Sequence, residues 1–191
     1  MALTAEQWFP SVIWSGKFTG IDNEAICSHL NDKKLLDPGV TISNYGGWQS
    51  SSIQQGDNVL FDGLVNAITG EINACSVQAD LPELQIQNVW ANINGPGSYN
   101  TLHNHAGALL SGVYYLRANP NQGNIFFERS DNAEYFLPPM PKPNYFTSTA
   151  TTYKALTGAI YVFPGWLKHM VQPNLSQDDR ISISFNYGVK P

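Results

Sequence analysis

The chain has 191 residues, of which 42% are hydrophobic and 13% charged, and this composition predicts a single folded domain over residues 1–191 with its own core. Its net charge of −5 and its ten scattered basic residues exclude the basic tracts with which proteins bind nucleic acids. No run is long enough to cross a membrane and the N-terminus lacks a signal-peptide pattern, so we expect a cytoplasmic protein.

Residues 1–80 predict helices that support a sheet from the outside. The apolar and aromatic run from Trp8 to Trp14 indicates an entering strand before them. The stretch IDNEAICSHLNDKKLLDPG follows, a helical pattern that Asp22 can cap and that Asp37-Pro38-Gly39 ends.

A second helical pattern starts near Ser52 and becomes clear between Phe61 and Cys75, where apolar residues recur at spacings of three and four. The two cysteines, Cys27 and Cys75, fall one in each helical pattern. This placement favours two buried thiols over a disulfide.

From residue 84 to residue 191 the chain changes to short apolar or alternating runs separated by Gly, Pro and Asn. These runs predict a mainly β (α+β) fold, a sandwich or a barrel with the helices flanking it. The proline-rich stretch Arg129–Asn144 predicts a surface loop. The expected strands are Leu84–Ile93, Leu109–Arg117, Gly123–Glu128, Tyr153–Phe163, Met170–Gln172 and Arg180–Tyr187.

Three of the four histidines indicate a metal site. His103 and His105 are two residues apart, so in an extended segment both side chains point to the same face. His169 follows a predicted strand far downstream, where a sheet closing on itself could bring it alongside. Three neutral imidazoles can bind iron, zinc, copper or nickel and leave other positions of the ion open. Taken singly, each histidine could instead make an ordinary hydrogen bond in the core.

Arg180 opens an alternating strand whose polar members, with Ser182 and Ser184 among them, all face one way. A buried cation beside a metal suggests a bound carboxylate. The alternative is a surface ion pair with Asp178 or Asp179, which would contribute little.

Several other side chains remain open between two roles. Four polar or aromatic residues before the metal motif could line a pocket or belong to the turn at Gly95-Pro96-Gly97; they are Asn92, Asn94, Tyr99 and Asn100. Three tryptophans are expected in the core, with one of them as a candidate wall of the site; they are Trp48, Trp90 and Trp166.

The segments that carry these residues resemble the iron- and 2-oxoglutarate-dependent oxygenases, in particular their prolyl-hydroxylase-like branch. The similar segments are WANINGPGSYNTLHNHAGALLSGVYYL, GNIFF, FPGWLKHMVQPN and RISISFN. With GGWQS included, the likeness extends over roughly residues 41–189 and is nearest to a subgroup found in marine phages and bacteria. The resemblance implies a double-stranded β-helix (jelly roll) core with the N-terminal helices outside.

The resemblance also implies the roles of site residues. His103, His105 and His169 would bind Fe(II), and Arg180, Tyr115 and Ser184 would hold the carboxylate of 2-oxoglutarate farther from the metal. Ser182, on the same face of the strand, is a further candidate or a small inward filler. His105 stands where the family has an aspartate or glutamate. Either it binds the metal directly, giving a three-histidine site, or the third protein ligand comes from elsewhere in the chain and His105 only supports the site.

The function that the resemblance implies is hydroxylation of an unidentified substrate with O2, releasing succinate and CO2. The substrate could be a protein side chain such as proline or a small molecule. Separately, the aromatic residues of the predicted strands are compatible with a homodimer. One alternative is a three-histidine metalloenzyme that does not use 2-oxoglutarate, such as a cupin-like dioxygenase or a zinc hydrolase. Another is a non-catalytic jelly-roll module for binding or structure.

Overall fold

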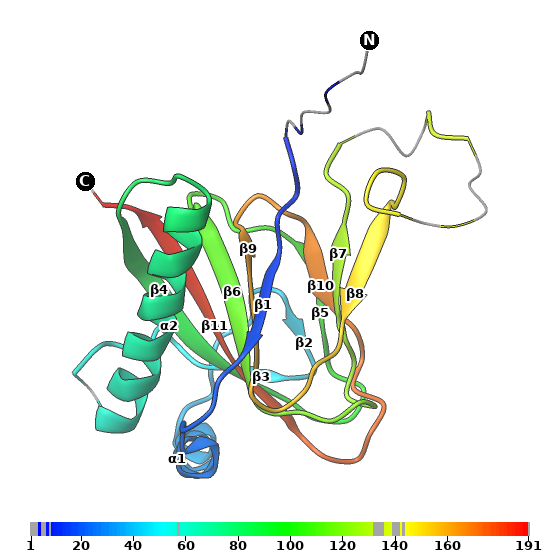
Figure 1. The fold of residues 1–191 in the computed structure, drawn as a ribbon. Coiled ribbons are helices and arrows are strands. Elements are labelled where there is room, and N and C mark those ends of the chain that lie inside the picture. The colour runs from blue at the N-terminus through cyan, green and yellow to red at the C-terminus, as the bar shows by residue number, and fades with distance from the viewer. Residues whose placement is uncertain are drawn as a thin grey trace.

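A computed structural model describes residues 9–56, 58–131, 136–138 and 144–190, together with Thr4, Gln7 and Lys142. Its strands form two antiparallel sheets that face each other, as the predicted jelly roll requires (Figure 1). The six-stranded sheet has the order β1-β9-β6-β11-β4-β3 and the five-stranded sheet the order β2-β5-β10-β7-β8.

The strands of the larger sheet are β1 (Trp14–Lys17), β9 (Ala159–Pro164), β6 (Leu110–Arg117), β11 (Arg180–Val189), β4 (Leu84–Asn94) and β3 (Trp48–Gln49). Those of the smaller sheet are β2 (Asn44–Tyr45), β5 (Tyr99–His103), β10 (His169–Val171), β7 (Ile125–Glu128) and β8 (Ala150–Tyr153). Five of the expected strands are confirmed within a few residues: β4, β6, β7, β10 and β11.

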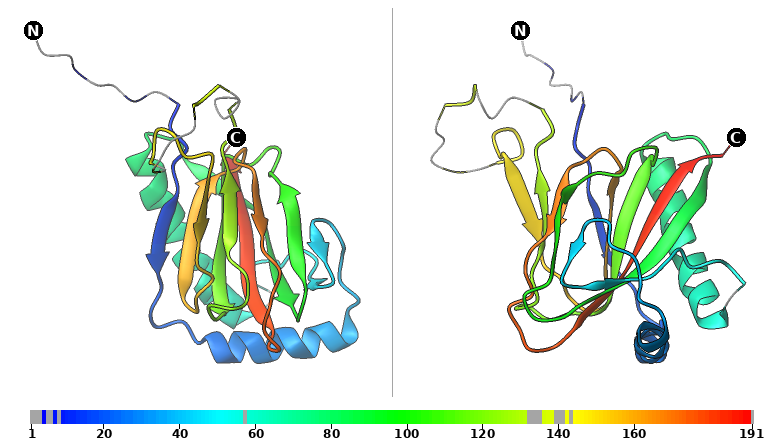
Figure 2. Two further views of the ribbon diagram at one scale, coloured as in Figure 1. Left: turned by 90° about the vertical axis from the view of Figure 1, so that its right-hand side faces the viewer. Right: turned by 180° about the vertical axis from the view of Figure 1, so that it is seen from behind.

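Two helices, α1 (Asn23–Leu36) and α2 (Val59–Gln78), lie outside the larger sheet, as predicted (Figure 2). Asp22 caps α1, because its side-chain oxygen accepts a hydrogen bond from the main-chain N–H of Ala25 at 3.0 Å. Apolar side chains of both helices pack with those of the sheet's outer face into the larger of two hydrophobic clusters. The smaller cluster lies between the two sheets. Neither helix combines the length and the apolar character that a membrane span needs.

Three sequence predictions about the boundaries were wrong. The second helix begins at Val59, where Asn58 caps it, and not near Ser52. The entering strand begins only at Trp14, because its ladder pairs Trp14–Lys17 with β9; Trp8 lies outside the described residues. The expected strand Tyr153–Phe163 is two strands, which a turn at Gly158 with φ of +84° separates and which belong to different sheets.

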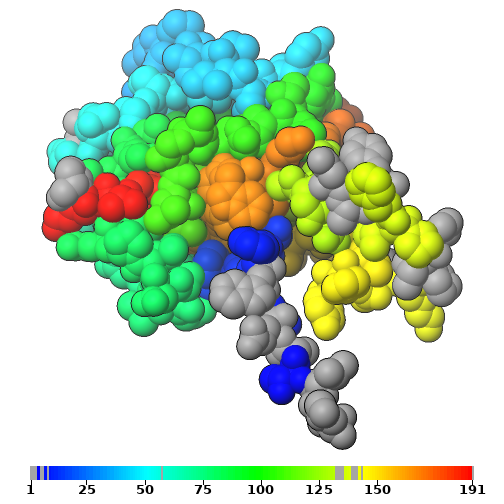
Figure 3. All heavy atoms as spheres, turned by 90° about the horizontal axis from the view of Figure 1, so that it is seen from above, coloured from blue at the N-terminus to red at the C-terminus, as the bar shows by residue number. Residues whose placement is uncertain are grey.

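Cys27 and Cys75 are buried and free, as predicted. Trp48 is in the core with 7% of its surface exposed, whereas Trp166 was wrongly placed there and is 47% exposed. Seen from above, the orange β9–β10 region that contains residue 166 reaches the surface (Figure 3). The same loop buries the neighbouring Leu167, which is 2% exposed, and leaves the side chain of Trp166 at the surface.

The proline-rich insert is described only in part, because residues 132–135, 139–141 and 143 lie outside the described residues. Among its described members, Phe136 is 85% exposed. This agrees with the expected surface loop.

Candidate metal and cofactor site

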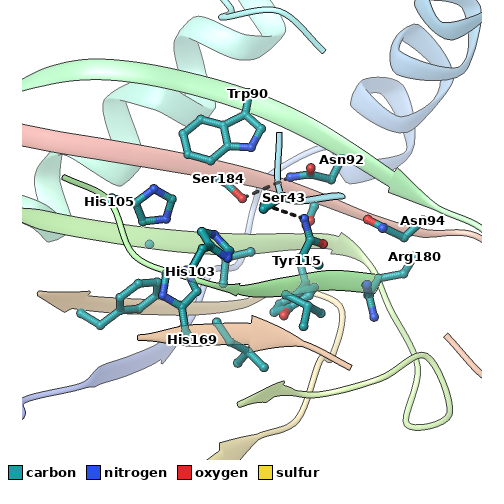
Figure 4. A pocket seen from close by; sticks show the side chains of 17 residues that line it. Ser43, Trp90, Asn92, Asn94, His103, His105, Tyr115, His169, Arg180 and Ser184 are labelled. Carbon is teal, nitrogen blue, oxygen red and sulfur yellow. Dashed lines mark hydrogen bonds between the residues drawn. The ribbon is translucent and has the colours of Figure 1, made fainter. Parts of the chain in front are cut away.

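A pocket lies between the two sheets, on the inner face of the larger one (Figure 4). Alternate residues of three neighbouring strands point into it, because side chains alternate between the faces of a sheet. From β4 these are Trp90, Asn92 and Asn94, from β11 Arg180, Ser182 and Ser184, and from β6 Val113 and Tyr115. The smaller sheet contributes Asn100, His103, Ile125, His169 and Val171.

The expected convergence of the three imidazoles is present at one end of this pocket. His103 ends β5 and is the direct cross-strand partner of His169, which begins β10. His105 lies in the loop after β5, and its main-chain N–H donates to the carbonyl of Gly165 at 2.8 Å. One ring nitrogen of each histidine lies within 4.8 Å of the others, close enough to hold one metal ion.

A bulge in β5 explains why Asn100 and His103, three residues apart, both face the pocket. The β10 residues His169 and Val171 pair with His103 and Asn100, so three steps of β5 match two steps of β10. The extra residue returns both Asn100 and His103 to the inner face. The sequence contains no signal for this bulge, and β5 was not among the expected strands.

Hydrogen bonds orient two of the imidazoles. The Nδ1 atom of His103 lies 2.7 Å from the carbonyl oxygen of Thr101, and that of His169 lies 2.9 Å from the carbonyl oxygen of Leu167. A carbonyl oxygen only accepts, so Nδ1 carries the proton and Nε2 keeps its lone pair for a metal. Among the described residues nothing hydrogen-bonds to the ring of His105, whose centroid lies 5.7 Å from that of the Trp90 ring.

Burial keeps these imidazoles neutral near pH 7. It lowers the pKa of His103, and it lowers the pKa of His105 to about 4 and that of His169 to about 3, with nearby imidazoles adding to the effect. Only the neutral imidazole can coordinate a metal. The three residues are therefore in the protonation state that metal binding requires.

At the other end of the pocket lies Arg180, with 1% of its surface exposed. Its Nη1 donates to the main-chain carbonyls of Gln122 and Gln172, while its Nη2 is buried without a partner. The expected alternative, a surface pair with Asp178 or Asp179, is absent from the described ion pairs. A buried guanidinium with a free donor requires an anion or another acceptor.

Two further donors next to Arg180 on the neighbouring strands also lack a partner. They are the hydroxyl of Tyr115 and the Nδ2 of Asn94, both buried. Burial raises the pKa of Tyr115 to about 12 despite the opposing effect of Arg180, so the hydroxyl remains a donor. One acceptor, Oδ1 of Asn92, is also unpaired. With three free donors against one acceptor and no Asp or Glu among the lining residues, this end of the pocket suits a carboxylate.

Ser182 and Ser184 are two residues apart in β11 and therefore lie on the same face of the strand. Ser182 pairs with Asn92 and Tyr115 in the neighbouring strands, whereas Ser184 is one step nearer the histidines, level with Trp90 and Val113. The hydroxyl of Ser184 accepts a hydrogen bond from Nδ2 of Asn92 at 3.2 Å.

Of the residues left open between pocket and turn, three line the pocket: Asn92, Asn94 and Asn100. Tyr99 does not line it and stacks on Tyr45 with ring centroids 5.0 Å apart. Ser43 and Phe163 line the pocket as well but were missed. The signal was weak for Ser43, since it precedes a strand of only two residues.

Residues 88–186, a little more than half of the chain, match the model of the family described as "Putative 2OG-Fe(II) oxygenase". No curated protein matches the chain. Among solved structures, a Pseudomonas putida prolyl-4-hydroxylase is similar with a TM-score of 0.69 and 14% identity, over 95% of this chain and 94% of that one.

HygX from Streptomyces hygroscopicus, with nickel and 2-oxoglutarate bound, is similar with a TM-score of 0.64 and 16% identity, over 99% of this chain and 88% of that one. The viral collagen prolyl hydroxylase vCPH from Paramecium Bursaria Chlorella virus-1, in its 2OG complex, has a TM-score of 0.60 and 15% identity, over 92% and 96%. At these identities the likeness concerns the fold.

The expected nearness to marine phage and bacterial proteins stays a prediction. The family match is different, because it spans β4 to β11 and includes all three clustered histidines, Tyr115 and Arg180. It also decides against a non-catalytic module and a metalloenzyme without 2-oxoglutarate. The chain belongs to the 2OG-Fe(II) oxygenases, enzymes that use non-haem iron and 2-oxoglutarate.

Proposed function

We propose that this oxygenase hydroxylates its substrate in the pocket between the sheets, with iron(II) bound by His103, His105 and His169. Their clustered nitrogens, their neutral state and the free Nε2 of His103 and His169 support this ligand set. Direct binding by His105 is favoured over a supporting role, since no described residue competes for its ring nitrogens. A site of three neutral ligands leaves the ion its double positive charge, which favours a dianionic co-ligand.

We further propose that Arg180, Tyr115 and Asn94 hold the carboxylate of 2-oxoglutarate that is farther from the metal. The observation that carries this proposal is the set of three buried donors without partners at the opposite end of the pocket from the histidines. A carboxylate has about four lone-pair positions and can accept from all three donors. Ser182 and Ser184 lie between these donors and the histidines, so their hydroxyls would border the bound 2-oxoglutarate.

When bound, iron(II) and 2-oxoglutarate supply the oxidising chemistry, in which O2 is consumed, succinate and CO2 are released and the substrate gains a hydroxyl group. The residues of this chain orient the reactants. Arg180 fixes one end of 2-oxoglutarate so that its 2-oxo acid end faces the histidines. Trp90 and Phe163 form apolar walls near the histidines, which exclude water from that end.

The substrate is a protein side chain such as proline, or a small molecule. Both classes occur among the similar folds, in the prolyl hydroxylases and in HygX with hygromycin B bound. Succinate release in the presence of proline-containing peptides, compared with release in the presence of small alcohols and sugars, separates the two. The expected homodimer stays a prediction.

An anaerobic titration of the metal-free protein with iron(II) and then 2-oxoglutarate tests the site. We expect a weak visible charge-transfer band, since the 2-oxo acid would bind the metal through two oxygens. In Arg180→Met the 2-oxoglutarate concentration that gives half of the band should rise about 100-fold, because a charged hydrogen-bonding partner is lost. His105→Ala should weaken iron binding itself.

The matched control is Arg117→Met, because Arg117 lies in β6 but pairs with Glu24 outside the pocket. This variant should bind both iron and 2-oxoglutarate as the unaltered protein does. Iron binding without any band on addition of 2-oxoglutarate would contradict the proposed function.

A further inference from the structure

The guanidinium of Arg180 is held by main-chain carbonyls and not by an acidic side chain. Nη1 donates to the carbonyl of Gln122 and, at 3.2 Å, to that of Gln172. Two acceptors on one nitrogen fix the plane of the guanidinium, and so decide where Nη2 points. Because these acceptors are neutral, the positive charge stays available to a bound anion. The positions of the two carbonyls therefore control the anion-binding end of the pocket.

The side chain of Gln122 fixes one of these carbonyls. Gln122 is 1% exposed, and its Nε2 donates to Oγ of Ser176 at 3.1 Å and to the carbonyl of Asp178 at 2.9 Å. Its Oε1 accepts from the main-chain N–H of Asn119 at 2.9 Å, within the turn that joins β6 to β7. Both hydrogens of the carboxamide thus bind this turn to the loop between β10 and β11, which leads directly into Arg180.

At the next residue the main chain packs tightly against Arg180 and Gln172. Gly123 has a φ of +82°, and a Cβ there would lie 2.8 Å from Nη1 of Arg180 and would collide with the carbonyl of Gln172. The main chain passes directly against the guanidinium at this point. A shift of the turn would therefore displace the Gln122 carbonyl and the guanidinium together.

The same loop also fixes the second strand that lines the anion-binding end. Nδ2 of Asn174 donates to the carbonyl of Asn94 at 2.8 Å and to that of Asp178 at 2.7 Å. Gln122 and Asn174 thus converge on the carbonyl of Asp178, one from the β6–β7 turn and one from the loop itself. The free donors of Arg180 and Asn94 keep their relative position through these bonds.

We propose that Gln122 is a positioning residue for 2-oxoglutarate: its buried carboxamide locks its own carbonyl against Arg180, which keeps Nη2 directed at the far carboxylate. This inference rests on the proposed function, since it needs 2-oxoglutarate to lie with that carboxylate at Arg180. Gln122 acts only through Arg180. Its removal should therefore affect ligands that carry the far carboxylate and spare those that lack it.

The experiment measures dissociation constants in the anaerobic iron(II)-loaded protein for two acids, 2-oxoglutarate and 2-oxopentanoate, which lacks the far carboxylate. The variant Gln122→Met keeps the length of the side chain and removes its hydrogen bonds. We expect a dissociation constant about tenfold higher for 2-oxoglutarate and unchanged for 2-oxopentanoate. Gln177→Met, an exposed position in the loop that Gln122 holds, is the matched control and should change neither value.

Equal weakening of both acids in Gln122→Met would indicate general loosening of the pocket and would overturn the inference, as would unchanged binding of both. If Gln122→Met does not fold, Ser176→Ala decides by the same measurement. It removes one of the two acceptors of the carboxamide and should weaken 2-oxoglutarate alone, about threefold. If the unaltered protein forms no complex with 2-oxoglutarate, the proposed function itself has failed; a complex that Gln122→Met leaves intact overturns only the role of Gln122.

Discussion

The two faces of the six-stranded sheet are built by the same strands, but one face is apolar and the other carries polar side chains. In β11, Ile181 and Ile183 point toward the helices and belong to the larger hydrophobic cluster, whereas Ser182 and Arg180 point into the pocket. β4 and β6 repeat this division. Apolar burial on the helix side contributes about 25 cal/mol for each Å², whereas buried polar groups without partners cost about 1–3 kcal/mol each.

The comparison indicates that stability and ligand binding are separated by a single sheet. The helix face supplies the burial that lets the pocket face keep buried donors without partners. Substitutions on adjacent residues of one strand should therefore have different consequences.

The largest effect on stability is expected from Ile183→Ala. Ile183 has no exposed surface and lies in the helix-side cluster, so truncation leaves a cavity and should lower the free energy of unfolding by about 2–5 kcal/mol. Urea unfolding measures the loss. Ser182→Ala, the neighbouring residue on the pocket side, should cost less than about 1 kcal/mol. Similar losses in the two variants would show that both faces contribute equally.

The next effect concerns metal binding by His105. His105→Leu should lower the affinity for iron(II) or cobalt(II) at least about 100-fold, because a ligand is lost, with little change in stability. His105→Asp puts a carboxylate ligand in place of the imidazole and should bind within about tenfold of the unaltered protein. Competition with a coloured chelator measures both values. Normal metal affinity in His105→Leu would exclude His105 as a ligand.

A smaller effect is expected from Tyr115→Phe, which should raise the stability of the protein and lower its affinity for 2-oxoglutarate. The buried hydroxyl of Tyr115 has no partner in the ligand-free protein, so its removal should raise the free energy of unfolding by about 1 kcal/mol. The same change should weaken 2-oxoglutarate binding about tenfold. Tyr114→Phe is the control on the other face, where the hydroxyl donates to Asn23 at 2.8 Å. That variant should lose stability and bind 2-oxoglutarate normally.

The smallest effect is expected at the end of a helix. Asp22→Ala removes the cap of α1 and should lower the free energy of unfolding by about 1 kcal/mol, with no change in the affinity for metal or 2-oxoglutarate. Asp32→Ala, an exposed aspartate within the same helix, should change stability by less than about 0.5 kcal/mol. An effect of Asp22→Ala on 2-oxoglutarate affinity would show that the helix side does influence the pocket.

Much of the division between the apolar helix side and the polar pocket side of the sheet could be predicted from the sequence. The alternation in RISISFN assigned Arg180, Ser182 and Ser184 to one face, because a strand has a period of two residues. The spacing of His103 and His105 also predicted that their imidazoles lie together, although β5 ends at His103 and His105 reaches the site from the loop that follows. The cap at Asp22 and the stop at Asp37 defined α1 for a similar local reason. Features that depend on neighbours within a few residues were therefore predictable.

The sequence by itself determined the class of fold, the three histidines and the buried arginine, since period, capping and residue chemistry are local properties. Only the tertiary structure decided which buried polar groups remain without hydrogen-bond partners and which are held in place by hydrogen bonds. The bulge that turns His103 inward arises from the pairing of β5 with β10, and Gln122 binds the carbonyl of Asp178, 56 residues farther along the chain. The free donors of Asn94 and Tyr115 likewise depend on the side chains that the fold places around them. Such contacts depend on the register between strands and on close packing, which no local pattern encodes.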